Sequence, residues 1–366
     1  MKAARHTPLP LQRPAPAHSS PKLEEVPVRA EECVQTLKRL LLLLVLTFHL
    51  SPFTFHLSPL QAQDIHFSQQ GENPILMNPA YTGFYDGTGR FGLIYRNQWA
   101  SVSAPFQTYA LTAETALNRS RQRLSGMNLG VVALRDVAGT LNYGSFAARL
   151  SLAYYFALDR QGTSILSVGA DGGYVGSGFD PTHAEMEDPS EVFEKQRTGY
   201  PVFDAGIAWF WQPSGDWQVK TGAAVRNINR PNTSYLGLDD TRLAPLLNLY
   251  LRAEWRCWQA LSLLPTLMMQ LQGQYREAVY GMDLKWYLEE VSRHQVSFAT
   301  GVAFRHDDAL VTHLTMEYDA FVFAFYYDAN LSSLSAASNT IGAFELGMVY
   351  RLVRDKSVRA IKCPVF

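Results

Sequence analysis

The chain has few charged residues and almost no cysteine. Charged residues make up 18% of its 366 residues, whereas a soluble domain usually carries about 25%. The formal net charge is -1, which argues against a basic nucleic-acid-binding surface. Cys33, Cys257 and Cys363 are the only cysteines, too few and too far apart for a disulfide framework or a Cys-x-x-Cys site. We therefore expect no nucleic-acid partner and no disulfide-stapled domain.

The sequence also lacks long apolar runs and catalytic motifs. No apolar run reaches the roughly 18 residues that a transmembrane helix needs. There is no Ser/His/Asp arrangement, no phosphate-binding loop and no helical His-Glu-x-x-His motif. His294, His306 and His313 fit no ligand spacing, and an interior histidine is the plainer interpretation of His313. We therefore expect neither a helical membrane protein nor an enzyme, with no cofactor and no metal.

The first 62 residues have the pattern of an export signal. Lys38 and Arg39 precede the apolar run 40–46, and a small-residue exit follows at Gln61-Ala62. A basic n-region, a short apolar h-region and a small-residue cleavage site are typical of a secretory signal. We predict cleavage near Ala62. The long proline-rich stretch before Lys38 suggests that the true start codon lies further downstream.

The rest of the chain alternates between apolar and polar residues. Alternation at period two places successive side chains on opposite faces of a strand. The clearest case is the apolar series Tyr280, Met282, Leu284, Trp286 and Leu288; in the segment 246–258, Cys257 falls on the apolar face. We count about fourteen such segments: 91–99, 107–117, 127–135, 144–158, 163–175, 201–211, 217–227, 246–258, 262–273, 278–288, 294–305, 309–318, 320–330 and 341–352.

These segments have the number and length of the strands in a bacterial outer-membrane barrel. Such barrels use even numbers of antiparallel strands, each of about 9–11 residues. We predict an all-β fold, a transmembrane antiparallel up-and-down β-barrel of about 14 strands. The predicted parts are a leader and signal peptide (1–62), a pre-barrel segment (63–90), the barrel (91–352) and a C-terminal tail (353–366).

The two faces of these strands favour a membrane barrel over a soluble sandwich. The apolar face should meet lipid and end in aromatic girdles. The girdle candidates are Tyr81, Tyr95, Trp99, Trp209, Trp211, Trp217, Trp255, Trp286 and Tyr350. The other face carries Gly, Ala and Ser with isolated charges, which suits a crowded lumen. The lumen charges are Arg149, Asp171, Arg252, Glu254, Arg256, Asp283, Lys285, Arg305 and Glu317.

The lumen charges and one acidic insertion each allow two interpretations. The charges either line a conduit or hold a plug, or they simply pair across strands, since unpaired buried charges are costly. Residues 176–200 form the longest polar insertion. We expect a surface loop there, which either contacts an exported partner or calcium or is only a solvated acidic loop. Its acidic residues are Asp180, Glu185, Glu187, Asp188, Glu191 and Glu194.

Several motifs resemble those of the PorP/SprF membrane proteins of the type IX secretion system. The mature start 63–69 (QDIHFSQ) is followed by Asn78-Pro79-Ala80-Tyr81-Thr82-Gly83, similar to the family's Asn-Pro-Ala-Tyr-x-Gly signature. Residues 95–99 (YRNQW) resemble its first-strand motif, and the block 327–345 its last-strand region. The ending Cys363-Pro364-Val365-Phe366 resembles a Cys-Pro-x-Phe tail, with Val365 where a basic residue is expected. The resemblance spans the mature chain.

The resemblance implies an outer-membrane component of a secretion and gliding apparatus. Its implied partners are outer-membrane lipid, other type IX components, and a secreted surface protein with a C-terminal sorting domain that it helps to export or retain. The alternative is an outer-membrane transporter or porin for small or hydrophobic solutes. The motif residues also have two interpretations. They either contact a partner or have structural roles, as a turn (78–81), as a lumen-facing and interface-anchoring segment (96–99) and as a docked tail. These residues are Asn78, Pro79, Ala80, Tyr81, Arg96, Asn97, Gln98, Trp99, Cys363, Pro364 and Phe366.

Overall fold

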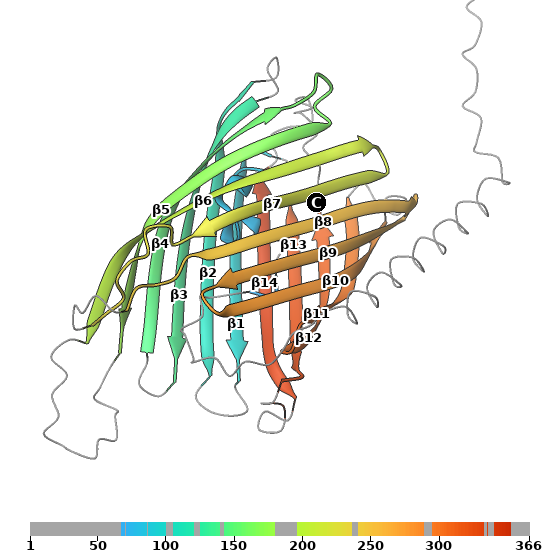
Figure 1. Cartoon of the computed structure of the whole chain (residues 1–366). Coiled ribbons are helices and arrows are strands. Elements are labelled where there is room, and N and C mark those ends of the chain that lie inside the picture. The colour runs from blue at the N-terminus through green and yellow to red at the C-terminus, as the bar shows by residue number, and fades with distance from the viewer. Residues whose placement is uncertain are drawn as a thin grey trace, which may run out of the picture. The chain divides into compact units, whose positions relative to one another are not determined.

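Fourteen antiparallel strands form a closed barrel in which each strand pairs with its neighbours in sequence and β1 pairs with β14 (Figure 1). The computed structural model describes residues 67–69, 71–85, 87–99, 105–120, 125–139, 143–179, 196–235, 241–288, 295–332, 335 and 340–352. The strands are β1 (Gly89–Gln98), β2 (Phe106–Ser120), β3 (Ser125–Ala138), β4 (Tyr143–Ala157), β5 (Ser164–Gly178), β6 (Arg197–Ser214), β7 (Trp217–Arg226), β8 (Leu246–Trp258), β9 (Leu261–Gln272), β10 (Tyr275–Tyr287), β11 (Val296–Arg305), β12 (Ala309–Tyr318), β13 (Phe321–Asn330) and β14 (Ile341–Leu352). The predicted fold class is confirmed.

The connections between strands differ in length at the two ends of the barrel. β1 begins and β14 ends at the same end, which we call the terminal end, because Gly89 pairs with Leu352. Short connections such as 215–216, 259–260 and 319–320 close this end. The opposite end, the loop end, carries the longest connections, 179–196 and 227–245.

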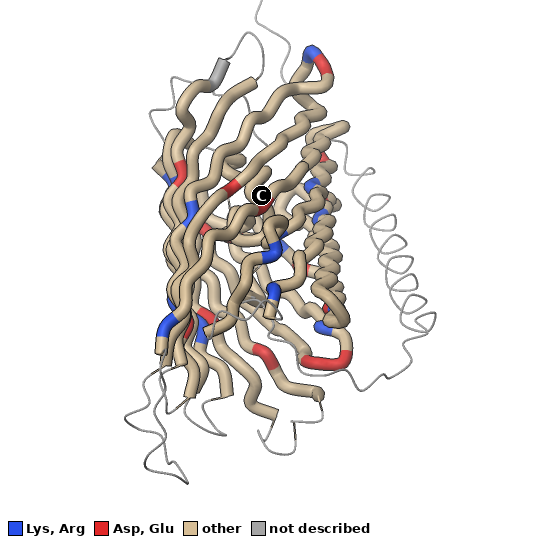
Figure 2. Tube along the Cα trace, turned by 60° about the vertical axis from the view of Figure 1, so that its left-hand side comes forward, with Lys and Arg blue, Asp and Glu red and all other residues tan. Residues whose placement is uncertain are grey.

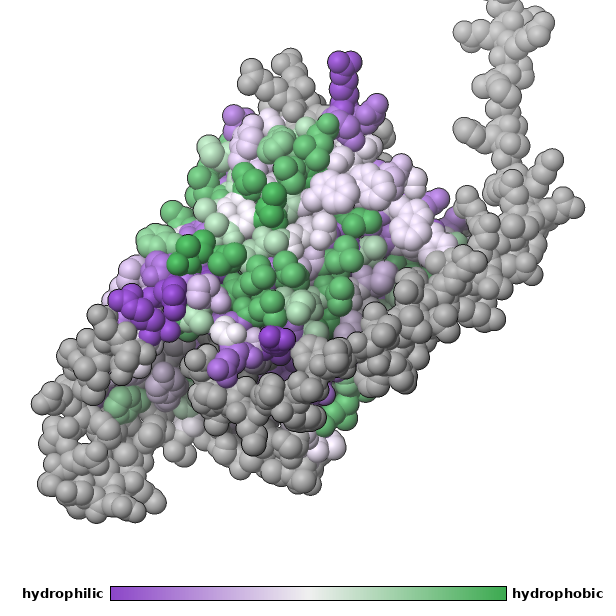
Figure 3. Space-filling model, in the orientation of Figure 1, coloured by the Kyte–Doolittle hydropathy of each residue, from purple (hydrophilic) through white to green (hydrophobic). Residues whose placement is uncertain are grey.

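The outer face of the wall is apolar, as the alternation predicts. Large apolar side chains alternate outward along the strands, as in β12 and β13, where Leu314 is 54% exposed and Phe325 is 45% exposed. In Figure 3, hydrophobic residues gather across the middle of the visible face. All tryptophans except Trp99 lie near the terminal end, where Trp209 stacks on Trp211 and Trp217 on Trp255. Within the described residues, no helix is long and apolar enough to span a bilayer.

Two assignments to the outer face are wrong. Tyr81 is fully buried inside the barrel and is no girdle residue. Cys257 is 5% exposed and belongs to the inner face. The pairing of β8 with β9 shifts between Arg256 and Trp258, so the strict alternation breaks there and Trp258 takes the outward position at 44% exposure.

The longest predicted loop is shorter than the sequence indicates. β5 continues to Gly178 and β6 begins at Arg197, so both edges of the predicted loop 176–200 are paired strand. The pairs Gly176–Gly199 and Ser177–Thr198 extend the sheet beyond the alternating hydrophobic pattern, because Gly, Ser and Thr carry no such pattern. The acidic residues of this segment lie outside the described residues.

Candidate functional site

The chain segment before β1 lies inside the barrel. We call residues 67–69 and 71–85 the plug. Its first residues contact Asp328 and Glu345, which lie near the loop end of β13 and β14. Its last residue, Tyr85, donates a hydrogen bond to the carbonyl of Glu114 (2.9 Å) toward the terminal end of β2. The plug therefore runs through the lumen from the loop end to the terminal end, seen in blue inside the barrel in Figure 1.

The Asn-Pro-Ala-Tyr motif forms the turn at the centre of the plug. Asn78 caps the 3₁₀ turn η2 (Pro79–Tyr81) by accepting a hydrogen bond from the Ala80 amide, and Pro79 suits the first position because its φ is already set. The Asn78 side chain also donates to the carbonyls of Ile207 (3.0 Å) and Ala223 (3.3 Å). One side chain thus orders the turn and joins it to β6 and β7.

Glycines on the wall give the plug room. A methyl group placed on Gly169 would lie 2.5 Å from the Pro79 carbonyl and the Ala80 nitrogen, and one on Gly206 would lie 2.0 Å from Asn78 Oδ1. Gly92, Gly130, Gly222 and Gly347 face other plug residues in the same way. Since any larger residue would collide with the plug, this belt of glycines reflects close packing between plug and wall.

An aromatic cluster surrounds Tyr81 in the lumen. The Tyr81 ring makes edge contacts with Phe210 (5.7 Å) and Tyr250 (6.1 Å), and Lys220 Nζ lies 4.5 Å from its centre. This cluster provides apolar contact area that an entirely polar lumen would lack.

A group of buried charges holds the plug near the loop end. We call Arg96, Arg305, Asp328 and Glu345 the anchor cluster. Glu345 is fully buried and accepts hydrogen bonds from the backbone amides of Ser68 (2.7 Å) and Gln69 (3.0 Å). Asp328 accepts from the Ser68 hydroxyl (2.8 Å). Arg96 contacts both carboxylates, and Arg305 pairs with Asp328 at 3.1 Å. Arg305 also pairs with Asp308 (3.1 Å) and lies 3.9 Å from Glu277, so both arginines of the cluster are paired with carboxylates.

The predicted lumen charges all lie on the inner wall, and most form ion pairs there. Arg149 pairs with Asp204 (2.8 Å), Arg252 with Asp283 (2.8 Å) and Lys285 with Glu317 (3.0 Å). Arg305 belongs to the anchor cluster, and Asp171 is buried near Asp204. Glu254 accepts a hydrogen bond from the Tyr287 hydroxyl, and Arg256 lies 4.4 Å from the centre of the Tyr287 ring. Figure 2 shows how sparse these charges are along the strands.

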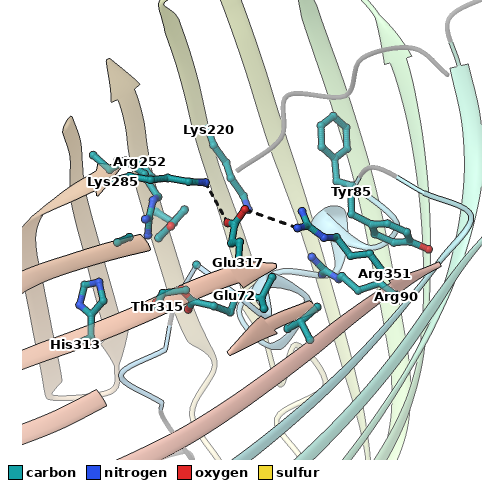
Figure 4. Close-up of a pocket in the computed structure, with 17 residues that line it drawn as sticks. Glu72, Tyr85, Arg90, Lys220, Arg252, Lys285, His313, Thr315, Glu317 and Arg351 are labelled. Atoms are coloured by element: carbon teal, nitrogen blue, oxygen red, sulfur yellow. Dashed lines mark hydrogen bonds and ion pairs between the residues drawn. The ribbon is translucent and has the colours of Figure 1, made fainter. Parts of the chain in front are cut away.

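A cavity remains beside the plug, toward the terminal end. We call it the cationic cavity; its volume is about 70 Å³. Its wall carries five basic residues from five strands and two carboxylates, Glu317 and the plug's Glu72 (Figure 4). The basic residues are Arg90, Lys220, Arg252, Lys285 and Arg351.

The other motif candidates take varied positions. Arg96 and Gln98 face the lumen, where Gln98 accepts a hydrogen bond from Arg96 (3.2 Å). Asn97 donates to the Tyr95 hydroxyl (3.0 Å), and the Trp99 ring packs edge-on against Phe106. Cys363, Pro364 and Phe366 lie outside the described residues. Contacts of these residues with a partner stay a prediction.

Sequence reasoning missed several residues of the site. Asp328, Glu345, Lys220 and Arg90 were not recognised as lumen charges, although Glu345 and Lys220 fit the inward alternation of their strands. Ser68 and Glu72 gave no signal, because their role depends on contacts with distant strands. Among the described residues, no cluster of three or more His, Cys, Asp or Glu could hold a metal ion.

The solved structures that align with this chain do so at low sequence identity. The toluene transporter TbuX of Ralstonia pickettii aligns with a TM-score of 0.46 and 11% identity, over 77% of this chain and 94% of that one. A FadL homologue of Pseudomonas aeruginosa gives 0.43 and 11%, over 75% and 92%. The toluene transporter TodX of Pseudomonas putida gives 0.44 and 8%, over 76% and 92%. These values carry no information on a substrate. A search of curated proteins gave no match.

The family model gives a specific result. The model of the type IX secretion system membrane protein PorP/SprF matches residues 60–350, which include the plug and nearly the whole barrel. The match agrees with the fold of a closed fourteen-stranded outer-membrane barrel. The chain belongs to the PorP/SprF family and is an outer-membrane component of the type IX secretion system.

Proposed function

We propose that this protein is a non-enzymatic docking component that helps the type IX apparatus to export a partner protein or retain it on the cell surface. The observation that carries the proposal is the family match combined with a lumen filled by the chain's own plug. A filled lumen leaves the two ends of the barrel as the surfaces for partners. Partner proteins of this kind carry a C-terminal sorting domain, and the machinery also serves gliding.

The proposed orientation follows from the connections. In outer-membrane barrels, long loops are extracellular and short turns are periplasmic. We therefore place the loop end outside the cell and the terminal end in the periplasm, with lipid against the apolar outer face. The signal peptide is removed near Ala62, and the mature chain then begins a few residues before the plug. The extracellular connections 179–196 and 227–245 are the candidate surface for the exported partner.

Deleting the gene tests the proposal. We expect the deletion strain to lose a surface protein or release it into the medium, while growth on individual nutrients stays normal. A growth defect on one nutrient with intact secretion would instead support the transporter or porin alternative.

A locked plug separates docking from conduction. The hydroxyls of Thr82 and Ser151 lie 2.7 Å apart, so a Thr82→Cys, Ser151→Cys disulfide would fix the plug to β4. We expect the locked protein to restore secretion to the deletion strain as well as the wild type does. A transporter that must displace its plug would lose its activity in the locked form.

A further inference from the structure

An apolar hollow opens on the outer face of the wall, over β6, β7 and β8 (Figure 1). We call it the outer hollow. Its volume is about 480 Å³, within the range of about 300–1,000 Å³ that is typical of ligand pockets. The side chains that line it from outside come from β5 to β9, so it faces the membrane and not the lumen.

Short side chains on β7 form the floor of the outer hollow. Thr221 and Ala223 point outward, and Gly222 between them has no side chain. Larger residues of β6 and β8 flank them: Trp209 and Leu251 beside Thr221, and Ile207 and Leu249 beside Ala223. A trough one strand wide therefore runs along β7 between two rows of large side chains.

The outer hollow offers no free hydrogen-bonding group from its outward side chains. The Thr221 hydroxyl donates to the carbonyl of Tyr250 (2.9 Å), and the Trp209 indole N–H donates to the Ser164 hydroxyl (2.9 Å). All other outward side chains of the lining are hydrocarbon or thioether. The chemistry of the lining thus suits a hydrocarbon chain.

The width of the trough decides what kind of apolar group can enter. Neighbouring strands are spaced by about 4.8 Å, so β6 and β8 lie about 10 Å apart, and the side chains of Ile207 and Leu249 narrow the opening further. A helix with its side chains is about 10–12 Å wide and does not fit. The convex wall of a second barrel would cover the trough without filling it. A single acyl chain fits lengthwise.

The trough begins beside the tryptophans of the terminal end. Trp209 stacks on Trp211, and Trp217 stacks on Trp255. Such aromatic residues mark the level at which lipid meets water. A phospholipid with its headgroup at this level reaches the trough with its acyl chain, whereas a free hydrocarbon has no such anchor.

The plug contacts the same stretch of wall from inside. The Asn78 side chain donates to the carbonyls of Ile207 and Ala223, whose side chains line the outer hollow. An unfilled space here would cost the wall its dispersion contacts. A chain in the trough therefore supports the wall directly behind the central turn of the plug.

We propose that the outer hollow binds one acyl chain of a membrane phospholipid. The chain lies along β7, between the side chains of β6 and β8. The inference concerns the outer face alone and depends neither on the docking role nor on which end of the barrel is extracellular.

Photo-crosslinking of the purified full-length protein in vesicles tests the site. The vesicles consist of dioleoylphosphatidylcholine with a small fraction of a phosphatidylcholine that carries a diazirine in its palmitoyl chain. The reference residues are Leu314 and Phe325, which point outward from β12 and β13. We expect adducts in the outer hollow to exceed those at the reference residues by about fivefold, a preference of about 1 kcal/mol.

A filled trough provides the matched comparison. Thr221→Leu combined with Ala223→Leu places larger side chains on the floor, and adducts on the flanking strands should fall to the level of the reference residues. Thr312→Leu combined with Ala329→Leu makes the same changes at outward positions of β12 and β13 and should leave the outer hollow labelled. Heat-modifiable migration shows that each variant is folded, which outward leucines in lipid favour.

Four results would contradict the inference. Even labelling of the outer face, or unchanged labelling in the filled variant, would show that the trough selects no chain. Labelling below that of the reference residues would show that a second copy covers it. Stronger enrichment of diazirine palmitic acid than of the phospholipid would indicate a free fatty acid site. Secretion by the complemented deletion strain is a separate measurement, so any of these results leaves the docking proposal intact.

Discussion

The anchor cluster and the cationic cavity are both groups of buried charges on the inner wall, but they differ in occupancy. In the anchor cluster, Arg96 and Arg305 pair with Asp328, Glu345 and neighbouring carboxylates. The plug itself fills the site, because the backbone amides of Ser68 and Gln69 donate hydrogen bonds to Glu345. In the cavity, most cations of the wall are paired with carboxylates of the barrel, and space of about 70 Å³ remains beside the plug. The plug therefore fixes its position through the first group and leaves the second group partly open.

Removing the central carboxylate of the anchor cluster should have the largest effect. In Glu345→Ala, the guanidinium of Arg96 and the amides of Ser68 and Gln69 lose a fully buried partner. Breaking a buried pair from one side costs about 3–5 kcal/mol. We expect the free energy of unfolding in urea to fall by about that amount. We also expect the variant to conduct ions in planar bilayers. Wild-type stability and a closed lumen in this variant would refute the anchoring role.

The comparison requires that both clusters face the lumen and not lipid. Leu314→Arg places a cation on the outer face, one position from the inward His313, and should cost about 2–4 kcal/mol near the bilayer midplane. Phe321→Arg, at the rim of the same outer face, should cost only about 0–1 kcal/mol. Folding titrations into lipid vesicles would measure both. Equal tolerance at the two positions would show that this face is not in lipid.

Substitutions at two glycines of β5 test how closely the plug packs against the wall. Gly169→Val pushes against Pro79 and Ala80, while Gly176→Val on the same strand meets nothing within 4 Å. Overpacking costs about 1–3 kcal/mol. We expect this loss for Gly169→Val only, measured by urea unfolding. If both variants lose the same stability, the cost comes from the strand and not from the plug.

The smallest effect on stability should come from a substitution in the cationic cavity. Lys220→Met removes a buried ammonium and keeps an apolar stem among the rings of Tyr81 and Phe210. Methionine is of similar length and removes the cost of burying that ammonium, so the free energy of unfolding should change by less than about 1 kcal/mol. A loss as large as that of Glu345→Ala would show that the two clusters do not differ.

The barrel could be predicted from the sequence because its signal is local. Each strand shows which face is apolar within about ten residues, and fourteen repetitions indicate closure. The exception at Cys257 has a local cause too, since one shift in pairing between Arg256 and Trp258 reverses the faces.

The site could be predicted only in part because it depends on distant contacts. Ser68 and Glu345 are 277 positions apart, and no pattern in either segment indicates the other. The lumen charges were found by alternation, but their partners follow from the barrel register. Tyr81 was taken for a girdle residue because an aromatic residue before the first strand has the same local appearance inside the lumen as at the rim.

The most direct test of the plugged lumen is a disulfide between plug and wall. In a background without Cys257 and Cys363, Thr82→Cys is combined with Ser151→Cys, which replaces hydroxyls 2.7 Å apart. The matched control combines Thr82→Cys with Ser145→Cys, on the same strand and six residues, or about 20 Å, from Ser151. We predict near-complete crosslinking of the first pair in native outer membranes and none of the second. Free thiols in the first pair, or equal crosslinking of both, would contradict a plug fixed in the lumen.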